Sequence, residues 1–168
     1  DTINTQCVTP CRSTTSQIEC QARKDVCEWS QGLLQCNTKC SVKFTTSLAS
    51  PANVTRSGCD ADQLCQYDMP TQICEPACRN NPNQAACEAQ DSCQWSRLTQ
   101  SCKRSCLSNI VASDCLTDAE CQWNNVNATC GTKCNLRYGT NGDACRQDNE
   151  CMWDTASSTC KMNCNLYV

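Results

Sequence analysis

The stretch CQWSRLTQSC, residues 93–102, has four near copies elsewhere in the chain. In each copy eight residues separate two cysteines, and an aromatic residue stands two positions after the first cysteine, while almost every other residue changes. Fixed cysteine spacing around a variable interior predicts a repeated unit that disulfides hold in shape. The other copies are CEWSQGLLQC from Cys27, CQYDMPTQIC from Cys65, CQWNNVNATC from Cys121 and CMWDTASSTC from Cys151.

Four cysteine positions, called b, c, d and a in chain order, make up one repeat. Three residues separate d from a in every copy, and five or six separate b from c, whereas the connection from a to the next b varies from 8 to 18 residues. Because insertions collect in connections between packed units, each repeat is expected to end at position a. The predicted repeats are residues 1–40, 41–78, 79–106, 107–134 and 135–168.

All 22 cysteines of the chain are expected to form disulfides. Four cysteines allow three pairings in each repeat, and among these we expect b with d and c with a. Cys7 and Cys11 are separated by three residues, as positions d and a are, so they are interpreted as the tail of a further repeat. They are expected to pair with each other or with cysteines of another chain. Position b is held by Cys20, Cys59, Cys87, Cys115 and Cys145, position c by Cys27, Cys65, Cys93, Cys121 and Cys151, position d by Cys36, Cys74, Cys102, Cys130 and Cys160, and position a by Cys40, Cys78, Cys106, Cys134 and Cys164.

The composition favours a secreted disulfide scaffold over a protein with one large core. The chain has 22 cysteines in 168 residues but only one Phe, four Trp and three Tyr. Disulfides persist outside the reducing cytosol, so we expect a soluble protein that is extracellular or at the cell surface, with any signal peptide already removed. Because the net charge is −3, we expect no nucleic-acid partner. We also expect no membrane insertion, because no apolar run is long enough to span a membrane.

Each repeat is predicted to fold as a short helix followed by a β-hairpin. In RNNPNQAACEAQDSC, Asn81 is expected to cap a helix whose first residue is Pro82 and whose helix formers are residues 84–90, and Ser113 is expected to cap the helix of the fourth repeat. The segment from c to d reads as a hairpin with a polar tip. The predicted fold class is therefore a small disulfide-rich protein with five tandem helix–hairpin modules in a quasi-linear array and little regular secondary structure.

One aromatic side chain recurs in register in every repeat and is expected to form the core of its module. A ring of this size buries roughly 200 Å² and fills the space between a short helix and a hairpin. A ladder of exposed rings for stacking on sugars is the alternative interpretation. The predicted core aromatics are Trp29, Tyr67, Trp95, Trp123 and Trp153.

The pattern resembles the PSI (plexin–semaphorin–integrin) repeat through the spacing of its cysteines and tryptophans. The matching pairs are Cys27 with Trp29, Cys93 with Trp95, Cys121 with Trp123, and Cys151 with Trp153. The chain departs from that family because Glu, Gln or Met replaces its glycine and no cysteine follows the Trp. The tandem array is also similar to cysteine-periodic surface antigens of protists. Both resemblances imply extracellular, non-catalytic, structural or adhesive roles.

No catalytic, cofactor or metal site is predicted. Without histidine there is no Ser-His or Cys-His relay. The cysteine spacings of three, five and eight residues do not suit zinc. Two acidic clusters lack EF-hand spacing and are interpreted as solvated helix faces rather than calcium ligands. These clusters are Asp114 with Asp118 and Glu120, and Asp143 with Asp148 and Glu150.

The sequence predicts a secreted glycoprotein that serves as a structural subunit of an extracellular coat, matrix or filament. Two sequons, at Asn53 and Asn127, are expected to carry glycans. The expected partners are copies of the same chain, other extracellular proteins or glycans, and the half-repeat at Cys7 and Cys11 is either a local cap or a head-to-tail contact. The alternatives are a carbohydrate- or protein-binding adhesive module and a protease inhibitor, for which Arg97 is the candidate specificity residue.

Overall fold

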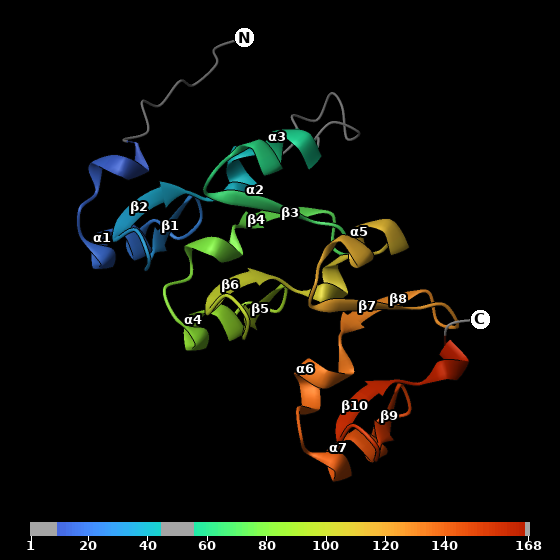
Figure 1. Cartoon of the computed structure of the whole chain (residues 1–168). Helices are drawn as coiled ribbons and strands as arrows, with labels where there is room; N and C mark the ends of the chain where they lie inside the picture. The colour runs from blue at the N-terminus through green and yellow to red at the C-terminus, as the bar shows by residue number, and fades with distance from the viewer. Residues whose placement is uncertain (1–9, 45–55, 167–168) are drawn as a thin grey trace. The chain divides into compact units, whose positions relative to one another are not determined.

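The computed structural model describes residues 10–44 and 56–166, so Cys7 and Asn53 lie outside the described residues. The chain divides into two compact units, of which one comprises residues 1–67 with 73–82 and the other residues 68–72 with 83–168. Within the described residues, a short helix followed by a two-stranded antiparallel hairpin occurs five times (Figure 1). The predicted helix–hairpin repeat is confirmed.

The helices that carry position b are α1 (Gln17–Ala22), α3 (Arg56–Ala61), α4 (Gln84–Glu88), α5 (Ala112–Thr117) and α7 (Gly142–Gln147). The hairpins are β1–β2 (Cys27–Ser30 and Gln35–Thr38), β3–β4 (Cys65–Asp68 and Ile73–Pro76), β5–β6 (Cys93–Ser96 and Ser101–Arg104), β7–β8 (Cys121–Asn124 and Thr129–Thr132) and β9–β10 (Cys151–Asp154 and Thr159–Met162). Position a begins a further helical turn, which the sequence analysis did not predict: η1 (Cys11–Ser13), α2 (Cys40–Lys43), η2 (Cys78–Asn80), η3 (Cys106–Ser108), α6 (Cys134–Tyr138) and η4 (Cys164–Leu166).

The helix caps differ in detail from the sequence prediction. Asn83, rather than Asn81, caps α4, because its side chain accepts a hydrogen bond from the backbone N–H of Ala86 at 2.9 Å. Ser113 lies inside α5, whose N-cap is Val111. Asn141 caps α7 in the same way as Asn83 caps α4, because its side chain accepts a hydrogen bond from the backbone N–H of Ala144.

The hairpin register places each aromatic ring beside a cysteine. Trp29 faces Cys36 across the β1–β2 ladder, and Trp95, Trp123 and Trp153 face the position d cysteine of their own hairpins in the same way. Since side chains alternate along a strand, the ring also lies on the same face as the position c sulfur two residues earlier. The hairpin thus directs one ring and two cysteines toward the helix.

The hairpin tips share a polar residue directly before the loop, at the third position after c. In the β5–β6 hairpin the Ser96 hydroxyl accepts a hydrogen bond from the Thr99 N–H at 3.0 Å, and in β7–β8 the Asn124 side chain accepts one from the Val126 N–H at 2.9 Å. Ser30, Asp68 and Asp154 make the equivalent bond. Such side-chain caps satisfy the loop N–H groups and set where the turn begins.

Each loop ends on a left-handed residue two positions before d. The five residues are not glycine and have φ between 50° and 57°: Leu34, Gln72, Gln100, Ala128 and Ser158. For an L-residue this conformation costs about 1–2 kcal/mol relative to the right-handed region. Every hairpin therefore contains a mildly strained position that packing elsewhere in the module must offset.

We expect Ala128→Gly to raise the free energy of unfolding by about 0.5–1 kcal/mol, because glycine removes the steric cost of positive φ, which outweighs the freedom that the unfolded chain gains. Urea unfolding of the oxidised protein measures the change. Ala85, which is also exposed but lies within α4, is the matched control, and its replacement by glycine should lower stability by up to about 1 kcal/mol. Equal losses in both variants would show that strain at the loop is not the governing effect.

The predicted pairing of b with d is confirmed, and the predicted pairing of c with a in the same repeat is wrong. Position c instead bonds the position a cysteine that precedes it in the chain. The b–d bonds are Cys20–Cys36, Cys59–Cys74, Cys87–Cys102, Cys115–Cys130 and Cys145–Cys160, and the a–c bonds include Cys11–Cys27, Cys40–Cys65, Cys106–Cys121 and Cys134–Cys151. Cys78 and Cys93 hold the equivalent positions and are both disulfide-bonded.

This connectivity corrects two further expectations, for Cys11 and for Cys164. Cys11 bonds Cys27 rather than Cys7. Cys164, which was expected to form a disulfide, is free and exposed. It holds position a of the fifth repeat, and in the described residues its counterparts at that position bond the cysteine at position c that follows them.

The packed module therefore begins at position a and ends just after d. The turn that begins at position a packs on the second strand of the hairpin that follows it: η1 on β2, α2 on β4, η3 on β8 and α6 on β10. By cysteine position the modules are residues 11–38, 40–76, 78–104, 106–132 and 134–162, and the boundary between the two compact units falls after residue 82, inside the third of these ranges. The boundaries of the modules differ from those of the predicted repeats by one cysteine. The position a cysteine begins a module, whereas it was predicted to end one.

Disulfide sulfur, rather than hydrocarbon, fills the centre of each module. In the fourth module the buried cluster consists of Cys106, Cys115, Cys121 and Cys130, and Trp123 packs against it as a half-buried ring. Trp29, Tyr67 and Trp153 pack in the same way on their own clusters. In the chain-entropy model, closing a loop of about 15 residues stabilises a module by roughly 3 kcal/mol, so two such bonds hold a unit with little apolar core.

Candidate functional site: the contacts between modules

A glutamine or glutamate directly after position c links each of the first four hairpins to the turn that follows it. The side-chain oxygen of Gln94 accepts a hydrogen bond from the backbone N–H of Cys106 at 2.8 Å, and that of Gln122 accepts one from Cys134 at 3.1 Å. Gln66 and Glu28 make the same bond to Cys78 and Cys40. The side chain caps the next helical turn and so fixes where the next module starts.

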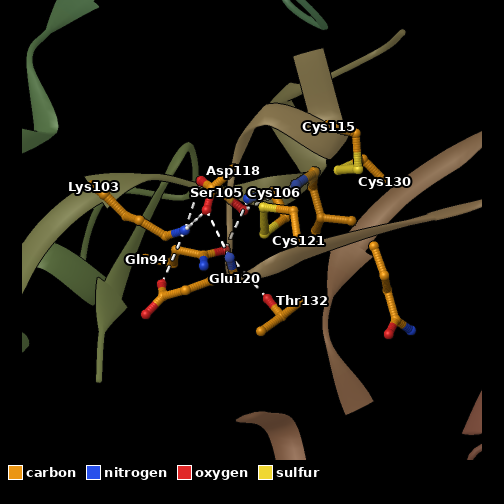
Figure 2. The surroundings of a disulfide bond; sticks show 12 residues. Gln94, Lys103, Ser105, Cys106, Cys115, Asp118, Glu120, Cys121, Cys130 and Thr132 are labelled. Carbon is orange, nitrogen blue, oxygen red and sulfur yellow. Dashed lines mark hydrogen bonds and ion pairs between the residues drawn. A yellow bond between two sulfur atoms is a disulfide. The ribbon is translucent and has the colours of Figure 1, made fainter. Parts of the chain in front are cut away.

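The contact between the third and fourth modules is centred on Glu120, which precedes Cys121 (Figure 2). One carboxylate oxygen accepts hydrogen bonds from the Ser96 hydroxyl at 2.8 Å and from the Leu98 N–H at 3.2 Å. The other lies 2.9 Å from the ammonium nitrogen of Lys103, which also contacts Asp118 at 2.6 Å. The side chain of Glu120 is only 7% exposed, yet both oxygens have partners.

The contact between the fourth and fifth modules repeats this design with Glu150. Asn124, the counterpart of Ser96, donates to Glu150 at 3.1 Å. Arg137 takes the place of Lys103 and reaches Glu150 at 3.0 Å and Asp148 at 2.7 Å. Both junctions therefore use a polar loop residue of the earlier module and a glutamate directly before position c. The basic side chain comes from the earlier module at the first junction, and at the second it is Arg137 of the later module, which reaches the fourth module through the Thr132 carbonyl at 2.8 Å.

Electrostatics at these junctions favour the charged forms. Burial by itself raises the pKa of Glu120, but hydrogen bonds from Lys103 and Ser96 outweigh it and hold the pKa below the ordinary value for a glutamate. The pKa of Asp148 is lowered in the same way, since hydrogen bonds from Tyr138 and Arg137 outweigh the effect of burial. The pKa of Arg137 is raised despite burial, because Glu150 and Asp148 stabilise its cation.

We expect the free energy of unfolding to fall as the pH drops from about 5 toward 2. Glu120 and Asp148 have a lower pKa in the folded state than in the unfolded chain, so their contribution is complete above the unfolded pKa and is lost as the pH falls through the folded one. Glu28 acts in the opposite direction, because burial raises its pKa. Urea unfolding at several pH values measures the slope, which Glu120→Gln should reduce; an unchanged slope would remove Glu120 as a contributor.

The two acidic clusters form ion pairs within the protein. Asp118 and Glu120 surround Lys103, and Asp148 and Glu150 surround Arg137. Asp143 pairs with Arg146 on the same helix and lies apart from that group. Basic side chains thus occupy the places that a cation would take, and the close cysteine sulfurs of these modules are bonded in disulfides.

The other candidate residues lie on the hairpins. Asn127 is exposed in the β7–β8 loop, where a glycan would project into solvent. Arg97 is exposed in the β5–β6 loop and lines a cleft that also includes Trp95. Cys164 and Met152, whose sulfur atoms are 3.8 Å apart, line a second cleft of about 800 Å³ beside the last hairpin.

Sequence reasoning recognised the cysteines and the rings but not the polar residues on either side of each ring. The signal was present, because the residue after position c is Glu or Gln in four of the five copies and the third residue after c is Ser, Asp or Asn in all of them. The motif is therefore Cys, Gln or Glu, an aromatic, and then Ser, Asp or Asn. Met152 breaks it in the fifth module, which is followed by the free Cys164.

None of the helices in residues 10–44 and 56–166 combines the length and the apolar character that crossing a membrane requires. The candidate functional site is therefore the set of repeated contacts between modules, with their side-chain caps and ion pairs. Comparisons with models of protein families, with curated proteins and with solved structures found no match for this chain.

Proposed function

We propose that this disulfide-stapled repeat protein is a secreted structural subunit, which joins further copies of itself in an extracellular coat, matrix or filament. The observation that carries the proposal is Cys164, an exposed free thiol at position a. Its counterparts Cys40, Cys106 and Cys134 each bond the next cysteine at position c. By the same rule Cys164 would bond a cysteine at position c of a further unit, and we propose that a second copy of the chain supplies the partner cysteine.

The way in which the modules are joined supports a structural role. A peptide segment and the glutamine cap connect neighbouring modules, and in the second compact unit the buried Glu120, with its ion pair to Lys103 of the preceding module, reinforces the contact. Many small units with repeated contacts suit a subunit that bears load or resists proteolysis, because no single opening event releases the whole chain. A glycan on the exposed Asn127 would also suit an extracellular surface. The resemblance to PSI repeats and protist surface antigens is consistent with this role.

The covalent step is the oxidation of two thiols. Cys164 and a cysteine of a second copy lose two protons and two electrons to an oxidant such as glutathione disulfide, which is reduced to two glutathione thiols, and one sulfur–sulfur bond forms. We propose Cys7 of the second copy as the partner, since Cys11 is already bonded to Cys27 and therefore does not pair with Cys7. Repetition of this bond makes an open head-to-tail chain.

Oxidation of the purified protein with glutathione disulfide, followed by non-reducing electrophoresis and mass photometry, tests the proposal. The head-to-tail bond predicts a ladder of covalent multimers that reductant dissolves and that Cys164→Ser or Cys7→Ser abolishes. The matched control is Ser157→Ala on the exposed β9–β10 loop, which should leave the ladder unchanged. Dimers that survive Cys7→Ser would replace head-to-tail assembly with a Cys164–Cys164 bond, and a strict monomer under all conditions would overturn covalent assembly.

A further inference from the structure

A cleft of about 630 Å³ lies in the second compact unit, beside α4 and the β5–β6 hairpin. Its volume falls within the range of small-ligand sites, which is about 300–1,000 Å³. Residues from three consecutive modules line it, including Trp95 from the third, Glu120 from the fourth and Leu136 from the fifth. The junction contacts that hold these modules together therefore also shape the cleft.

Part of the wall is fixed by contacts already described. Glu120 is held by Ser96 and Lys103, and Arg137 is held by Asp148 and Glu150. The Gln94 side chain is held between the Cys106 N–H and the Thr132 hydroxyl, at 2.8 and 3.3 Å. A wall whose side chains are already paired loses little conformational entropy when a ligand binds.

Three other lining groups have hydrogen-bonding capacity left over. Within the described residues, the side chains of Asp91 and Arg97 make no hydrogen bond or ion pair, and the indole N–H of Trp95 donates to no protein acceptor. The Trp95 ring is half-buried, so part of its surface contributes to the cleft. The cleft therefore combines an aromatic surface, a free carboxylate and a free guanidinium.

This combination selects for a ligand with hydroxyl groups and apolar C–H faces. A sugar hydroxyl donates to a carboxylate and accepts from a guanidinium, while the C–H face of a pyranose ring packs on an indole. The lining also carries charges of both signs, with Glu88, Asp91 and Glu120 against Arg97 and Arg137. A ligand with a strong net charge would therefore meet a group of its own sign.

We propose that the cleft around Trp95 binds a neutral oligosaccharide, with the Trp95 ring as the stacking surface and Asp91 and Arg97 as the hydroxyl partners. The site gives this chain a lectin-like activity that does not depend on Cys164 or on assembly. It assigns Arg97 to sugar recognition rather than to a protease cleft.

Isothermal titration calorimetry of the full oxidised chain tests the proposal, with four neutral trisaccharides as probes: chitotriose, cellotriose, laminaritriose and mannotriose. We expect at least one to bind with a Kd of about 0.1–1 mM and to shift the tryptophan fluorescence. Asp91→Ala and Arg97→Ala should each weaken binding about tenfold, the effect of losing one hydrogen bond to a charged group.

The controls are side chains at the equivalent positions of other modules. Asn149 stands two residues before Cys151 as Asp91 does before Cys93, and Asn125 stands four residues after Cys121 as Arg97 does after Cys93. Asn149→Ala and Asn125→Ala should leave the Kd unchanged. The proposal is overturned if none of the four probes binds at concentrations up to about 10 mM. It is also overturned if binding survives both Asp91→Ala and Arg97→Ala, since the sugar would then lie elsewhere.

Discussion

The double variant Cys115→Ser with Cys130→Ser is expected to unfold the fourth module while the first module keeps its structure. This bond closes a loop with a sequence separation of 15 residues and lies at the centre of the module. Its loss costs about 3 kcal/mol in loop entropy, and the two buried hydroxyls that replace it add to that cost. The Cys106–Cys121 bond and the half-buried Trp123 ring remain, but neither ties helix α5 covalently to the hairpin.

Hydrogen exchange read by mass spectrometry measures this effect module by module. In the variant, the backbone amides of residues 112–132 should lose protection, whereas those of residues 17–38 should keep it, since the first module has its own two disulfides. Cys164→Ser is the control, because that thiol is exposed and free. Full protection of the fourth module in the double variant would show that hydrogen bonds and packing, rather than sulfur, maintain the fold.

The helix–hairpin module could be predicted because cysteine spacing and the alternation of side chains are local properties. The position of Trp95 two residues after Cys93 already requires both to lie on one strand face, and the register in the structure agrees. The polar residues between positions c and d likewise predicted where the hairpin loops lie. Local sequence information was therefore sufficient for the types of element, whereas the b–d bond was one of three pairings that the cysteine spacing allows.

The a–c bond could not be predicted, because the d-to-a spacing is the same whether position a bonds backward or forward. The structure shows the physical reason for the forward bond. The Lys133 N–H donates a hydrogen bond to the Glu120 carbonyl at 2.9 Å. This bond extends the pairing of β7 with β8 by one residue beyond Cys121. Cys134 then starts a helical turn beyond the end of the ladder instead of facing Cys121, and it bonds Cys151.

The junction residues were missed for a related reason. The acidic clusters around Glu120 and Glu150 were interpreted as solvated helix faces, because the sequence does not show which basic residue reaches them. Lys103 lies on the preceding hairpin, whereas Arg137 lies on the turn after position a. The basic residue that pairs with the glutamate therefore comes from a different position in each of the two modules. This equivalence can be recognised only from the three-dimensional structure.

We expect Glu120→Ala to lower the free energy of unfolding of the second compact unit by about 2–3 kcal/mol. The variant leaves the buried Ser96 hydroxyl and the Leu98 N–H without their acceptor, and it removes one of two carboxylates from Lys103. Urea unfolding, with hydrogen exchange to locate the change, measures it. Glu19→Ala, an exposed glutamate in α1, should change stability by less than about 0.5 kcal/mol.

A double-mutant cycle separates the ion pair from the hydrogen bonds. If Lys103 and Glu120 interact directly, the effects of Lys103→Ala and Glu120→Ala should fall short of additivity by about 1 kcal/mol or more. Glu120→Gln should recover part of the loss, because an amide oxygen still accepts from Ser96 although the charge is gone. Additive single effects would mean that Lys103 is satisfied by Asp118 alone, and the junction would then depend on the Ser96 and Leu98 bonds rather than on charge.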